Sequence, residues 1–292
     1  MAVFSAPEAK FVGILTFTGL GPVRVGAKRA GNVLYTLRLR DGRLVIPSST
    51  WKGAFRSLAE KLAKTLQLSG VEKLAVESVS LAQGMAEKRR MVAWLVDEFV
   101  GALRGQRTEH FDPDDIKRVL VEIGYSEEEL QRLESPLDAL VHYLEYYCPV
   151  GRLFGNSVRA ASVRFLDTYI SAETILKPGI GIGRKGLTVE EGVLYFVELL
   201  PQVTSIKLAV VGEIEKRGDT ASRLLALVLE AIGEVGLSVG GCKSVGCGPL
   251  LLEFSEFHVV EYAKDPSGAL IVNPFKAPSM SLGVFAEWLR GE

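Results

Sequence analysis

The chain has 292 residues, of which 48% are hydrophobic and 24% charged, and its formal net charge at pH 7 is −1. This composition is ordinary for a globular protein. The sequence contains no apolar run of about eighteen residues that would span a membrane. The near-zero net charge argues against bulk electrostatic binding of nucleic acid. The N-terminus has no basic-then-apolar leader, and three cysteines make no disulfide framework. We therefore expect a cytoplasmic protein.

Charge is unevenly distributed along the chain. The segment between Leu20 and Glu60 holds eight basic residues, opposed only by Asp41 and Glu60. They are Arg24, Lys28, Arg29, Arg38, Arg40, Arg43, Lys52 and Arg56. Acidic residues are concentrated between Val71 and Tyr147 instead. A charge run can be a solvated face only, but a basic block interleaved with valine and glycine favours an anionic partner.

The N-terminal third predicts strands followed by a helix. Residues 11–17 and 33–39 are typical of strands, and Asp41-Gly42 of a hairpin turn before a return strand at 44–46. A helix from Ser48 to about Leu66 follows Pro47, with Ser48, Ser49 and Thr50 as candidate N-caps. Apolar residues recur along it at three and four positions and predict its buried stripe: Trp51, Phe55, Leu58 and Leu62.

Lys52 and Arg56 lie one turn apart on another face of this helix, in its first turns. Backbone amides and the helix dipole favour an anion there. Two cations beside capping hydroxyls therefore predict a phosphate site, although pairs of surface cations are also common on amphipathic helices.

Residues 71–147 predict an inserted helical subdomain. Residues 87–103 are amphipathic, Asp112-Pro113 is typical of a helix start, and Ser126 to Glu129 is a capping box. His110 and His142 are isolated, and we expect both to be structural. No catalytic constellation is present in this segment.

The rest of the chain returns to strands. Residues 160–170, 193–200, 206–214 and 250–257 predict strands, and Gly218-Asp219-Thr220 caps an apolar helix. Residues 177–186 contain a weak G-x-G-x-x-G match and favour a basic hairpin. The tail from His258 has no assigned structure.

The connection from Val235 to Leu250 is unusually dense in glycine, at positions 236, 240, 241, 246 and 248. It is not a Walker A loop, because Cys242 stands where lysine is required. Lys243 among bare backbone amides predicts a site for a phosphate chain, and a mobile loop between helix and strand is the alternative. Glycine would let another backbone approach closely.

Without the insert and the hairpin, the predicted order is β-α-β-β-α-β. The predicted fold class is α+β: a ferredoxin-like sheet, as in RNA-binding RRM domains, with an inserted helical subdomain and a β-hairpin. The sheet domain would comprise residues 1–70 and 148–258, with the hairpin at about 171–202, the insert at 71–147 and a C-terminal extension at 259–292.

Four motifs in this order resemble the RAMP superfamily of CRISPR-associated proteins. Residues 46–56, IPSSTWKGAFR, are similar to its IPGSSLKGALR motif, and 148–155, CPVGRLFG, to its C-x-x-C-x-LFG segment. Residues 179–198 resemble its thumb hairpin and LF-x-x-E strand, and 236–248 its glycine-rich loop. The backbone subunits of type III antiviral complexes are the most similar group.

The resemblance implies a palm and thumb that bind guide RNA (crRNA) and, through it, target RNA, with other CRISPR-associated subunits and copies of itself as partners. It implies no cofactor. Binding that does not depend on the guide sequence would be made to the sugar–phosphate backbone of the guide RNA. The implied RNA-binding residues are Ser48, Ser49, Lys52, Arg56, Gly240, Gly241, Lys243, Ser244, Gly246, Lys177, Arg184 and Lys185, and the basic loop adds Arg24, Lys28 and Arg29.

Two departures from the family pattern bear on activity. Tyr35 stands where catalytic backbone subunits have an aspartate, and Gly151 replaces the second cysteine. We therefore expect no catalytic residue and no metal site. The alternative is an endoribonuclease acting on target or guide precursor, but none of the three histidines lies near the first helix. A protein-only scaffold would leave the basic block without a role.

Overall fold

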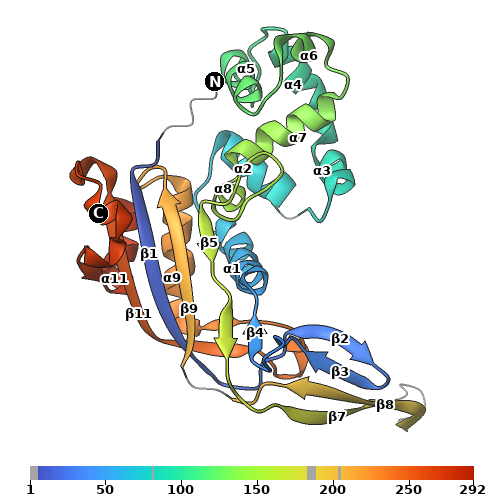
Figure 1. Ribbon diagram of the computed structural model, residues 1–292. Helices are drawn as coiled ribbons and strands as arrows, with labels where there is room; N and C mark the ends of the chain where they lie inside the picture. The colour runs from blue at the N-terminus through green and yellow to red at the C-terminus, as the bar shows by residue number, and fades with distance from the viewer. Residues whose placement is uncertain (1–5, 81, 183–188, 203–204) are drawn as a thin grey trace.

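A six-stranded antiparallel sheet lies at the centre of the computed structural model, which describes residues 6–80, 82–182, 189–202 and 205–292 (Figure 1). Its four main strands have the spatial order β11-β1-β9-β5, and every neighbouring pair is antiparallel. Short strands β10 and β12 both pair with β11. The bounds are Ala9–Gly19 for β1, Val163–Phe165 for β5, Ile206–Ile214 for β9, Leu237–Ser238 for β10, Pro249–Glu261 for β11 and Ser279–Met280 for β12.

Helices α1 (Ser48–Ala63) and α9 (Thr220–Val235) complete the chain order β1-α1-β5-β9-α9-β11. This is the β-α-β-β-α-β arrangement, so the α+β class is confirmed. Alternate residues of β1 are buried, and Phe17 stacks on Trp51 of α1 with ring centroids 5.6 Å apart. The predicted cap of the second helix is also confirmed, since Asp219 accepts a hydrogen bond from the Ser222 amide at 2.8 Å.

The strands differ from the sequence prediction in several places, and residues 26–30, expected in a loop, form a strand. The strand expected at 160–170 is two strands, because β5 pairs with β9 whereas β6 (Thr168–Ile170) pairs with β4 (Leu44–Ile46). The last strand runs to Glu261, because it stays paired with β1 as far as Ala9. The unassigned tail includes helix α11 (Leu282–Arg290), whose Phe285 stacks on Phe257 of β11 at 4.4 Å.

The part of the chain between α1 and β5 is helical, and it lies at the opposite end of the molecule from a second, smaller sheet (Figure 1). Asp112 and the Ser126–Glu129 capping box begin two of them as predicted. No helix in the described part of the chain is both long and apolar enough to cross a membrane. The bounds are Gly70–Ala75 for α2, Met85–Val92 for α3, Val96–Leu103 for α4, Pro113–Glu122 for α5, Glu127–Arg132 for α6, Pro136–Tyr147 for α7 and Pro149–Phe154 for α8.

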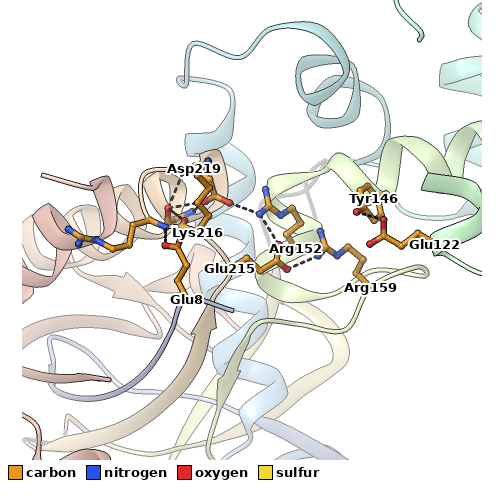
Figure 2. Close-up of polar contacts among 10 residues, drawn as sticks. Glu8, Glu122, Tyr146, Arg152, Arg159, Glu215, Lys216 and Asp219 are labelled. Carbon is orange, nitrogen blue, oxygen red and sulfur yellow. Dashed lines mark hydrogen bonds and ion pairs between the residues drawn. The ribbon is translucent and has the colours of Figure 1, made fainter. Parts of the chain in front are cut away.

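A network of ion pairs joins this helical region to the sheet (Figure 2). Arg152 of α8 bridges Glu215, at the end of β9, and Asp219, the N-cap of α9. Arg159 donates to Glu215 at 2.6 Å and lies over the ring of Tyr146 in α7. Only 15% of the Arg152 side chain is exposed, so these charges are paired within the protein and hold the two parts together.

A second sheet has the order β2-β3-β8-β7 and projects away from the body (Figure 1). Its bounds are Gly26–Ala30 for β2, Val33–Thr36 for β3, Ile175–Ile182 for β7 and Val189–Leu199 for β8. Buried Glu198 joins β8 to β3 by accepting hydrogen bonds from the Thr36 amide at 2.8 Å and from Arg38. Burial acts to raise the pKa of Glu198, but these hydrogen bonds outweigh it and hold the pKa below its ordinary value.

Candidate nucleic-acid interface

Three segments that are distant in the sequence meet around an open hollow of about 440 Å³. They are the loop before β2, the first turns of α1, and the glycine-rich connection between β10 and β11. Of the predicted residues, Ser49, Gly240, Gly241 and Lys243 come together here. The remaining lining residues are Val25, Gly26, Thr50, Gly53, Ala54 and Ser57, so no described lining residue is acidic.

The start of α1 differs from the prediction. Its N-cap is Pro47, and no side chain of Ser48, Ser49 or Thr50 caps the helix. Asp167, in the loop between β5 and β6, instead accepts a hydrogen bond from the Ser48 amide at 2.6 Å. A distant carboxylate thus takes the role expected of the local hydroxyls. Within the described chain those three hydroxyls make no hydrogen bond, which leaves them available to a ligand.

A stripe of small residues on α1 faces the hollow. Ser49, Gly53 and Ser57 recur every four residues and therefore share one face of the helix. Gly53 is exposed, and a Cβ built on it would meet no atom within 4 Å. Glycine in a helix interior costs about 1 kcal/mol relative to alanine, and packing within the chain does not require it here. Gly53 and Ser57 are not among the residues predicted from the sequence, although their four-residue spacing was a usable signal.

The two predicted cations of α1 have different surroundings. Arg56 donates to Glu60 at 2.9 Å and to the Gly155 carbonyl oxygen at 2.8 Å, so its guanidinium is engaged within the protein. Lys52 is half-buried and makes no ion pair with any residue that the structure describes. Of these two cations, only Lys52 offers a positive charge that is not paired within the described part of the protein.

The glycine-rich connection pairs with the basic loop before β2. Gly241 donates its amide to the Arg24 carbonyl oxygen at 2.8 Å, and Gly248 donates to Pro22 at 2.8 Å. Gly240 has a φ of +85°, and a Cβ there would lie 2.2 Å from the Arg24 oxygen. The expectation that glycine lets another backbone approach closely is confirmed at Gly240, where the approaching backbone is the protein's own, at Arg24. Gly246 also has a φ of +85° but faces open space.

The Arg24 guanidinium lies at the junction of these segments. Its Nη1 atom is 3.2 Å from the Cβ position of Gly26 and 3.4 Å from that of Gly241. Its Nε atom is buried and has no hydrogen-bond partner within the described residues. The loop thus places a cation directly beside two glycines that line the hollow.

The other predicted residues are not among those that line the hollow. Lys28 and Arg29 are exposed on β2, and Lys177 is exposed on β7. Ser244 lies in the exposed turn 243–245. Arg184 and Lys185 fall outside the residues that the structure describes. The positive charges are therefore distributed over the hollow and both hairpins.

Gly151 stands where the family that the sequence resembles has its second cysteine, and Asn156 fills the space beside it. A Cβ on Gly151 would lie 2.2 Å from the amide nitrogen of Asn156, which donates to the Glu145 carbonyl oxygen at 2.7 Å. Cys148 caps α8 by accepting from the Gly151 amide. Among the described residues, no group of three or more His, Cys, Asp or Glu side chains is placed to hold a metal ion.

Comparison with protein families places these features in context. The family model described as the RAMP superfamily matches residues 16–250, a span that includes every residue lining the hollow. No curated protein matches the chain. The chain belongs to the RAMP superfamily, a group of CRISPR-associated proteins that interact with RNA.

Proposed function

We propose that this chain binds the sugar–phosphate backbone of guide RNA as a structural subunit of a type III RNA-guided interference complex. The hollow is the observation that carries the proposal, because free hydroxyls, an open glycine face and Lys243 meet there without an acidic side chain among the described lining residues. Hydroxyls, amides and cations bind phosphate oxygens and carry no base specificity. Guides of any sequence would therefore be accepted.

In this proposal the central sheet is the palm and the β7–β8 hairpin is the thumb. The cross-strand partners Ile180 and Leu194 are 51% and 48% exposed, and Leu176 on the same face is 58% exposed. Exposed apolar side chains on a projecting hairpin suit contact with stacked bases of a guide–target duplex. Other subunits, including copies of this chain along the guide, complete the complex.

The proposal assigns no nuclease activity to this chain. The segment 19–33 holds no carboxylate or histidine that could bind a metal or accept a proton. Tyr35 is 36% exposed at the place expected for an acid. Asp41 accepts from Arg43 at 2.7 Å, and Asp167 accepts from the Ser48 amide. Both nearby carboxylates thus have structural partners.

Cleavage is tested with labelled complementary RNA and magnesium, using guide-loaded protein. We expect no cuts at regular spacing by the wild type. Regularly spaced cuts that disappear in Asp41→Asn or Asp167→Asn would contradict the non-catalytic proposal and indicate that the protein is an endoribonuclease.

Binding is tested by sequencing the RNA that co-purifies with the protein from its native host. Short RNAs that share a repeat-derived 5′ end support a guide-binding subunit. Recovery of the protein without RNA, or with unrelated RNA fragments, would contradict it.

A further inference from the structure

Two of the three cysteines lie together in the glycine-rich connection. The Cys247 amide donates to the Cys242 carbonyl oxygen at 3.2 Å, which closes the intervening turn. Cys247 is buried, and Cys242 packs with it against a small apolar cluster that includes Val197 and Leu199 of β8. Cys148 caps α8 and takes no part in this cluster.

Cys242 also has an unusual backbone conformation. Its φ is +59°, in the left-handed region that disfavours any residue with a Cβ. The same connection uses glycine at positions 240, 246 and 248, where φ is also positive. A cysteine at such a position adopts a conformation that glycine would adopt at lower cost. The backbone conformation does not explain why residue 242 is a cysteine, so we look for a function of its side chain.

We propose that Cys242 and Cys247 form a dithiol that closes reversibly to a disulfide within this connection when the protein meets a peroxide. Intracellular disulfides of this kind are transient and redox-sensing in most organisms. The bridge would enclose Lys243, which lines the hollow.

The chemistry assigns different roles to the two thiols. Cys242 is partly exposed, so its thiolate attacks one oxygen of hydrogen peroxide. An S–O bond forms, the O–O bond breaks, and the leaving hydroxide takes up a proton to become water. The Cys247 sulfur then attacks the resulting sulfenic acid, forming the S–S bond and releasing a second water. The two thiols supply both electrons that reduce the peroxide, and a thiol reductant reverses the reaction.

Burial favours this order of events. It raises the pKa of the Cys247 thiol, and the neighbouring Cys242 raises it further. Cys247 is thus the less reactive thiol towards an outside oxidant and is held beside the point at which Cys242 would be oxidised.

The test uses reduced full-length protein treated with equimolar hydrogen peroxide, followed by alkylation and peptide mass spectrometry. Trypsin cuts after Lys243, so a Cys242–Cys247 bridge joins two tryptic peptides that separate on reduction. We expect this cross-link in wild type and in Cys148→Ser, its absence in Cys247→Ser, and full reversal by dithiothreitol. Cys242 and Cys247 remaining free, reaching sulfinic acid without a bridge, or linking separate molecules would overturn the proposal.

A second arm rests on the proposed function. RNA bound in the hollow would cover the flanking Gly241 and Lys243, so added single-stranded RNA should slow alkylation of Cys242 in reduced protein. An unchanged rate would overturn the RNA path through the hollow, whereas the disulfide proposal is decided by the cross-link alone.

Discussion

Replacing Gly53 by alanine should strengthen the fold and weaken RNA binding. The added Cβ meets nothing within 4 Å, so α1 accepts it without strain. Alanine is favoured over glycine in a helix interior by about 1 kcal/mol, and we expect the free energy of unfolding to rise by roughly 0.5–1 kcal/mol. The same methyl group enters the hollow where an RNA backbone would lie. Losing a single charge-assisted hydrogen bond costs about 1.5–3 kcal/mol, which lowers affinity by about tenfold or more.

Urea unfolding measures the first effect, and fluorescence anisotropy with two unrelated single-stranded RNAs measures the second. Gly233→Ala is the matched control, since Gly233 is an exposed position of α9 where a Cβ would make only an ordinary contact with Leu282. We expect this control to stabilise the fold without changing RNA affinity. If Gly53→Ala binds both RNAs as tightly as wild type does, the open face of α1 is not an RNA contact.

Four further substitutions test the charges. Lys52→Ala should reduce the slope of log RNA affinity against log salt concentration by about one without changing the melting temperature. Arg56→Ala should lower the melting temperature, because its hydrogen bond to the Gly155 carbonyl oxygen is lost. Equal melting temperatures of the two variants would contradict this difference. Arg152→Ala removes the ion pair of half-buried Asp219 and one of the two ion pairs of Glu215, and it should cost about 1–3 kcal/mol in urea unfolding. A loss well below about 1 kcal/mol would refute the network's role. Folding lowers the pKa of Glu198, so the stability that this carboxylate contributes is complete above its unfolded pKa of about 4.3 and is lost as pH falls through the lower folded pKa. Glu198→Gln lacks this titration and should therefore lose less stability than wild type between pH 5 and pH 3. Parallel losses in the two proteins would contradict this role of Glu198.

Local patterns in the sequence were sufficient for the buried face of α1 and for the starts of α5, α6 and α9. The apolar spacing of Trp51 and Phe55 predicted the buried face of α1, and Asp219 predicted the start of α9. These signals act within one or two turns of the chain. Two of the four family motifs, residues 46–56 and 236–248, also lie at the hollow, and the basic block predicted its third segment.

Contacts between distant segments could not be predicted in the same way. Asp167 caps α1 from 119 residues away, and Arg56 binds the Gly155 carbonyl across 99 residues. The first depends on where the loop between β5 and β6 is placed, and the second on where the end of α8 is placed. The reason for glycine at position 240 likewise became visible only once the Arg24 backbone was placed beside it. Sequence alone therefore predicted some of the residues that line the hollow but not which predicted residues have partners within the described part of the protein.

Photocrosslinking of 4-thiouridine RNA, followed by peptide sequencing, tests the path of RNA across this protein most directly. We expect cross-links in the loop before β2, the first turns of α1 and residues 239–246, with RNAs of unrelated sequence. Cross-links confined to residues 71–147, where 16 acidic residues outnumber 9 basic ones, would contradict RNA binding in the hollow.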